Sequence, residues 1–86
     1  MSDKASKLLQ RAKSSPNGWM KNELLQLYMA FGFIIEEGRS HCIAKHPDHP
    51  EVFAAITRSS KELSSGYVRN AVSLIEKVKK LESKNG

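Results

Sequence analysis

The N-terminal third of the chain carries two sets of apolar residues at helical spacing. The first set, at i, i+3, i+4 and i+7, predicts a short helix with Ser2 or Asp3 as its N-cap. Its apolar positions are Ala5, Leu8, Leu9 and Ala12. Turn-forming residues at 14–18 end this helix, and a second is predicted from about Lys21, with Gly32 as a left-handed C-terminal cap. The apolar positions of the second helix are Leu24, Leu25, Leu27, Tyr28 and Phe31.

Three short segments beyond residue 32 have the composition and alternation of strands. They are expected at 33–35, 40–46 and 52–56, with a break at 37–39 and a compact turn at 47–50. Short turns between consecutive strands predict an antiparallel meander. Side chains alternate between faces along a strand, so one face of the second strand holds His41, Ile43 and Lys45 and the other holds Cys42, Ala44 and His46.

A long amphipathic segment begins at Gly66, after the polar stretch 58–65, and predicts a final helix. Its apolar stripe consists of Tyr67, Val68, Ala71, Val72, Leu74, Ile75, Val78 and Leu81. The cationic run Lys77, Lys79 and Lys80 is interpreted as a solvated helix face. The order helix, helix, three strands, helix predicts an α+β fold in which helices cover one face of a single antiparallel sheet and leave the other face free.

The chain of 86 residues has room for one small core, which predicts a single domain spanning 1–86. Within it we expect a helical extension at 1–16, the core at 19–82 and a frayed tail at 83–86. Hydrophobic residues make up 40% of the chain and charged residues 27%, a globular rather than a disordered composition. The net charge of +5 favours a polyanionic partner.

The single cysteine bears on cellular location, and the aromatic residues bear on the composition of the core. Cys42 is the single cysteine, so no internal disulfide forms and a reducing, cytoplasmic location is expected, with Cys42 in the core. No apolar run approaches the roughly 20 residues that cross a membrane, and no signal-peptide pattern opens the chain. Five aromatic residues are interpreted as core rather than as a base-stacking platform. They are Trp19, Tyr28, Phe31, Phe33 and Phe53.

All three histidines lie close together, on the second predicted strand and the turn after it, beside Arg39 and Lys45. An imidazole transfers protons near neutral pH, and a nearby cation neutralises charge on a phosphoryl oxygen. A ribonuclease that uses the 2′-hydroxyl of its RNA substrate as nucleophile needs both groups. In such an enzyme His41 acts as base or acid, and Arg39 or Lys45 holds the phosphate. The alternative is that His41 is an exposed strand histidine without a task.

Metal binding is the second chemistry that a histidine cluster permits. The potential ligands are His41, Cys42, His46 and His49. His41 and Cys42 point to opposite faces of a strand, and no CxxC or HxxxH pair completes a tetrahedral site, so neither a metal nor another cofactor is predicted. His46, which directly precedes Pro47, is expected to shape the turn, and His49 is expected to be exposed to solvent.

Three short motifs, taken together, resemble those of HicA-type mRNA interferase toxins from bacterial toxin–antitoxin systems. The motifs are Gly-Arg-Ser-His at 38–41, Lys-His-Pro at 45–47 and Leu-Ser-Ser-Gly-Tyr-Val-Arg at 63–69. The resemblance runs from about Trp19 to Leu81. It implies a double-stranded-RNA-binding-domain-like fold and a metal-independent endoribonuclease that cuts mRNA with His41 as catalytic residue. It also implies a HicB-type antitoxin as protein partner.

Two departures from the family pattern leave other functions open. Arg39 stands where Ser or Thr is commoner, and Ser64 and Ser65 replace the usual proline before Gly66. A degenerate toxin that retains only antitoxin binding, a non-catalytic RNA-binding module and a protein-interaction domain are therefore alternatives. Within the toxin interpretation, Arg39, Ser40 and Lys45 are the expected RNA-binding residues, and Tyr67 or Lys45 is a candidate catalytic partner of His41.

Overall fold

A computed structural model of the chain, which describes residues 3–58 and 61–84, has the predicted order of helices and strands. The elements are α1 (Asp3–Ser14), α2 (Lys21–Ala30), β1 (Ile34–Glu37), β2 (His41–His46), β3 (His49–Thr57) and α3 (Ser65–Lys84). The α+β class is confirmed. Among the described residues, no helix combines the length and apolar character that crossing a membrane requires.

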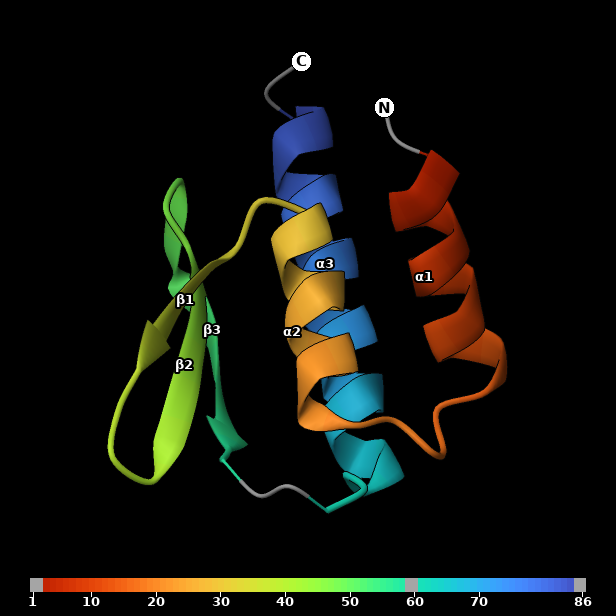
Figure 1. Cartoon of the computed structure of the whole chain (residues 1–86). Coiled ribbons are helices and arrows are strands. Elements are labelled where there is room, and N and C mark those ends of the chain that lie inside the picture. The colour runs from red at the N-terminus through yellow and green to blue at the C-terminus, as the bar shows by residue number, and fades with distance from the viewer. Residues whose placement is uncertain (1–2, 59–60, 85–86) are drawn as a thin grey trace.

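The three strands form one antiparallel sheet in the order β1-β2-β3, as the predicted meander requires. Figure 1 shows the helices on one side of this sheet: α2 and α3 lie next to the strands, and α1 packs against both of these helices on the side away from the sheet. None of the described helices lies on the other face of the sheet. We call these two sides the covered face and the open face.

Alternation along the strands assigns side chains to the two faces. In β2, Cys42, Ala44 and His46 are buried on the covered face, as predicted. In β3 the buried positions are Val52, Ala54 and Ile56, which places Phe53 on the open face with 58% of its surface exposed. The prediction that Phe53 is a core residue is therefore wrong, because its position between two inward-facing residues outweighs its apolar character.

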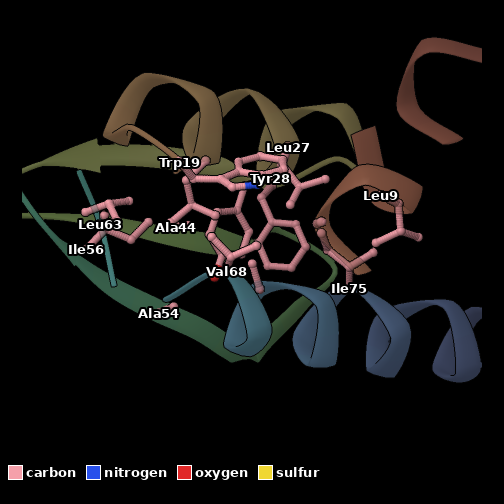
Figure 2. Packing of buried hydrophobic residues seen from close by; sticks show 14 of the residues in the cluster. Leu9, Trp19, Leu27, Tyr28, Ala44, Ala54, Ile56, Leu63, Val68 and Ile75 are labelled. Atoms are coloured by element: carbon pink, nitrogen blue, oxygen red, sulfur yellow. The ribbon is translucent and has the colours of Figure 1, made fainter. Parts of the chain in front are cut away.

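The core lies between the covered face and the helices (Figure 2). Trp19, predicted as a core residue, is fully buried, and its indole Nε1 donates a hydrogen bond to the Ser15 carbonyl at 2.8 Å. Tyr28 and Phe33 are also buried, with their ring centroids 5.0 Å apart. Burial raises the pKa of the Tyr28 hydroxyl, which is therefore neutral in the core.

Several element boundaries differ from those predicted. β1 extends through Glu37, and Phe33 precedes it. β3 begins at His49, because His46 pairs with His49 and leaves only Pro47 and Asp48 in the turn. Gly32 follows α2 with a φ of +89°, as expected of a left-handed cap. Asp3 is already in α1, while Ser2 lies outside the described residues, as do positions 85–86 of the predicted frayed tail.

An ion pair joins α1 to the start of α2. The Glu23 carboxylate accepts a hydrogen bond from the Met20 backbone N–H at 3.1 Å and lies 2.9 Å from the Arg11 guanidinium. The Met20 N–H and the Arg11 charge lower the pKa of Glu23. The same Arg11 guanidinium lies 4.5 Å from the centre of the Trp19 ring, so one cation covers the buried indole and holds the carboxylate.

Candidate functional site

His41 is the first residue of β2, exposed on the open face next to the β1–β2 loop. Its carbonyl accepts a hydrogen bond from the Gly38 N–H at 2.8 Å, which closes the loop. A Cβ atom at position 38 would lie 2.9 Å from that carbonyl oxygen. Only glycine therefore fits here without displacing the backbone of His41.

Arg58, which follows β3, holds the same loop from the other side. Its backbone N–H donates to the Ser40 carbonyl at 3.2 Å, and its guanidinium Nη1 donates to the Gly38 carbonyl at 2.6 Å. The second nitrogen, Nη2, lies 3.4 Å from the Glu37 carboxylate. Arg58 thus positions the backbone on both sides of Arg39, a role that the sequence did not indicate because it depends on a contact 20 residues away.

Arg39 and Ser40 lie in this loop, directly before His41, with exposed side chains. In the described part of the chain, the Arg39 guanidinium makes no ion pair. Two of the three predicted RNA-binding residues, one of them a cation, are therefore close to the candidate catalytic histidine along the chain.

Lys45 shares the open face with His41 but lies at the other end of β2. Four residue steps along the strand place their Cα atoms about 13 Å apart. The Lys45 ammonium is 2.8 Å from the Glu36 carboxylate of β1. No hydrogen bond or ion pair joins Lys45 to His41 among the described residues, and the Lys45 charge is shared with Glu36.

Two exposed apolar side chains flank Lys45 across the sheet. The register pairs Ile34 with Lys45 and Lys45 with Phe53, so the three residues form a row across the open face. Ile34 is 48% exposed and Phe53 is 58% exposed. An exposed aromatic ring beside a lysine is an arrangement on which a nucleic-acid base can stack. The alternation of β3 is the sequence signal that would have identified Phe53.

Tyr67, the other candidate partner of His41, is half-buried at the start of α3. It lines a shallow depression together with Gly66, Asn70 and Ala55, an exposed residue of β3. No hydrogen bond joins Tyr67 to His41 in the described residues. The geometry therefore leaves His41 with Arg39 and Ser40 as its neighbours along the chain, and does not place Tyr67 or Lys45 in contact with it.

The other two histidines lie on the opposite side of the sheet. His46 is buried, and its Nδ1 accepts a hydrogen bond from the Asp48 N–H at 3.2 Å, which confirms the prediction that His46 shapes the turn. His49 was expected to be solvated, but only 13% of its side chain is exposed, because it pairs with His46 in the sheet and faces α3. The prediction for His49 is wrong. Cys42 is buried, as predicted.

Comparisons with known proteins provide no further assignment of this site: no family model, no curated protein and no solved structure matches the chain. A proposal for function therefore depends on the open face, on the loop that holds His41 and on the sequence motifs described above.

Proposed function

We propose that the protein is the toxin of a type II toxin–antitoxin system, a HicA-type endoribonuclease that cuts mRNA without a metal ion. The observation that supports this most strongly is the setting of His41. An exposed imidazole begins β2 two residues after Arg39, whose guanidinium makes no ion pair with the described residues, and glycine geometry and Arg58 hold the loop before it in place. The arrangement of helices and strands is compatible with a double-stranded-RNA-binding-domain-like fold, which we include in the proposal.

The proposed reaction is an internal transesterification. His41 accepts the proton of the RNA 2′-hydroxyl as that oxygen attacks the adjacent phosphorus. The bond from phosphorus to the 5′-oxygen breaks, and the leaving oxygen takes a proton from a general acid or from water. The products are a 2′,3′-cyclic phosphate and a 5′-hydroxyl. Arg39 and Ser40 stabilise the charge on the phosphoryl oxygens.

The remainder of the open face would hold the RNA on one side of the cut. Lys45, about 13 Å from His41 along β2, would contact a neighbouring phosphate rather than the one that is cleaved. Phe53 would stack on a base beside it. In the antitoxin-bound state, a HicB-type partner would cover this face, including the exposed Ile34 and Phe53.

The test is digestion of RNA by the purified protein in EDTA, beside the variants His41→Ala and His49→Asn. We expect His41→Ala to lose at least about a hundredfold in rate, because general acid–base catalysis contributes about 10² to 10⁴. His49→Asn is the matched control, since His49 lies on the covered side. The ends of the products are mapped for 2′,3′-cyclic phosphate. Equal cleavage by His41→Ala and the parent would disprove the assignment of His41.

A non-catalytic RNA-binding module, or a degenerate toxin, is the second candidate, and the row of Ile34, Lys45 and Phe53 supports it. This function needs the stacking ring and the cation but no acid–base group. It predicts RNA that stays intact in every lane while the folded parent binds it with an affinity that falls steeply with salt. If the folded protein does not bind RNA at moderate salt, a protein-interaction domain is favoured instead.

A further inference from the structure

A cluster of two imidazoles and two carboxylates lies at the turn between β2 and β3, against the last turns of α3. The Nε2 atoms of His46 and His49 lie 3.9 Å and 4.0 Å from the same carboxylate oxygen of Glu82. The two rings are 5.1 Å apart between centroids. A carboxylate oxygen of Asp48 lies within 4.8 Å of a ring nitrogen of His46 and of Glu82. We call these four residues the turn cluster.

The turn cluster has a buried donor atom without a partner. His46 is 4% exposed, and His49 is 13% exposed. Nε2 of His49 is inaccessible to solvent and makes no hydrogen bond with the described residues. Leaving a polar atom buried and unpaired costs free energy, so most such atoms have a partner. This nitrogen lies 4.0 Å from the Glu82 carboxylate, a distance too long for a hydrogen bond.

We propose that the turn cluster binds a divalent transition metal ion, with Zn²⁺ as the best match. The ligands are Nε2 of His46, Nε2 of His49 and a carboxylate oxygen of Glu82, and water completes the tetrahedron. Zn²⁺ takes imidazole and carboxylate ligands at about 2.0–2.2 Å, which places neighbouring ligand atoms about 3.4 Å apart. Glu82 must approach each nitrogen by about half an ångström, which its exposed side chain can make, and the two imidazole rings, 5.1 Å apart between centroids, must turn their Nε2 atoms towards the ion.

The proton balance identifies a role for Asp48. In the metal-free protein, Nδ1 of His46 accepts the Asp48 N–H, so the neutral ring carries its proton on Nε2. Binding of the metal to Nε2 moves this proton to Nδ1, and the 3.2 Å hydrogen bond from the Asp48 amide is lost. The Asp48 carboxylate would then accept a hydrogen bond from the Nδ1–H group of His46. A carboxylate that orients a metal-bound histidine in this way is common in zinc sites.

The proposed metal would be structural and separate from the proposed RNA chemistry. His46 points to the covered face, whereas His41 points to the open face. The ion would join the β2–β3 turn to the end of α3 and hold together segments more than thirty residues apart in the sequence. The sequence prediction weighed four potential ligands, His41, Cys42, His46 and His49, and favoured no metal because His41 and Cys42 point to opposite faces. It did not include the two-residue turn that brings His46 opposite His49.

The test measures Zn²⁺ binding by the full chain without an affinity tag, by titration calorimetry and by thermal unfolding in ZnCl₂ and in EDTA. We expect a melting temperature that rises with ZnCl₂ concentration, because a ligand that binds only the folded state stabilises it. His49→Gln and Glu82→Gln should each weaken Zn²⁺ binding at least tenfold. His41→Gln is the matched control and should bind Zn²⁺ as the parent does. Co²⁺ should give the visible absorption of a tetrahedral site in the parent and in His41→Gln.

Three outcomes would overturn the proposal. The first is no heat and no change in melting temperature at 100 µM ZnCl₂, a concentration on the order of that used for weak sites. The second is unchanged Zn²⁺ affinity in both His49→Gln and Glu82→Gln. The third is loss of binding in His41→Gln, which would place the metal on the open face. Each of these is independent of whether the protein cleaves RNA, so this proposal and the proposed function can fail separately.

Discussion

His41 and His46 lie five positions apart in one strand, and the two faces of the sheet give them different surroundings. His41 is exposed beside a polar loop that contains the exposed Arg39. His46 is buried, with its ring edge-on to Phe33 at 5.2 Å and next to His49. An odd spacing in a strand places two identical side chains on opposite faces. The comparison separates the proposed RNA chemistry, on the open face, from the covered face, which stabilises the fold and carries the proposed turn cluster.

Two isoleucines on opposite faces test this division most strongly. Ile56 is 1% exposed on the covered face, and Ile34 is 48% exposed on the open face. Ile56→Ala should lower the free energy of unfolding by about 2–5 kcal/mol, because it leaves a cavity in the core. Ile34→Ala should cost under about 1 kcal/mol. Urea unfolding of both variants measures the difference, and equal losses would mean that the open face is also part of the core.

Phe53 tests the open face as an RNA-binding surface. Phe53→Ala should weaken RNA binding by about 1–3 kcal/mol, roughly five- to 150-fold, because stacking of a base on an aromatic ring contributes that amount. The free energy of unfolding should change by under about 0.5 kcal/mol. Affinity is measured by fluorescence anisotropy in the His41→Ala background, so that the RNA stays intact. Phe53→Tyr is the control and should bind normally; a loss in both variants would argue against stacking.

The alternation of apolar residues was sufficient to predict the element order and the two faces of β2. The two wrong predictions gave more weight to whether a residue is apolar or polar than to its position in the strand. Phe53 was placed in the core because it is apolar, and His49 in solvent because it stands between turn residues. Both errors are corrected by the strand pairing, which places His49 opposite His46. Local sequence patterns therefore predict the helices and strands and the face to which each strand residue points.

The side chains that complete each site come from distant parts of the sequence. Arg58 reaches the loop before His41, Glu36 reaches Lys45, and Glu82 reaches the two buried histidines. A contact between residues on different elements depends on register and helix packing, which periodicity alone does not specify. Candidate residues such as His41 and Arg39 could therefore be found from the sequence, whereas their partners could not.

Two exposed ion pairs, one on each side of the molecule, give the smaller tests. On the helical side, the pKa of Glu23 is lowered from 4.5, so its charge contributes stability above that pH, and this contribution is lost as the pH falls through the lowered pKa. Glu23→Gln should cost under about 1 kcal/mol at pH 7. The difference from the parent should shrink as the pH falls below 4.5 and through the lowered pKa. RNA affinity should not change, and a change would mean that RNA also contacts α1 or α2.

On the open face, Glu36→Gln should instead strengthen RNA binding. The Lys45 ammonium lies 2.8 Å from the Glu36 carboxylate, and a phosphate must compete with that carboxylate for the same cation. Removing the negative charge should raise affinity about two- to threefold, with little effect on unfolding, because an exposed pair contributes under about 1 kcal/mol.

Glu76→Gln is the matched control: it breaks another exposed lysine–carboxylate pair, with Lys13 at 2.7 Å, and changes the net charge equally. If both variants gained equally, the effect would come from net charge and not from Lys45. A gain confined to Glu36→Gln, and abolished by adding Lys45→Gln, would place a phosphate of the RNA at the centre of the open face.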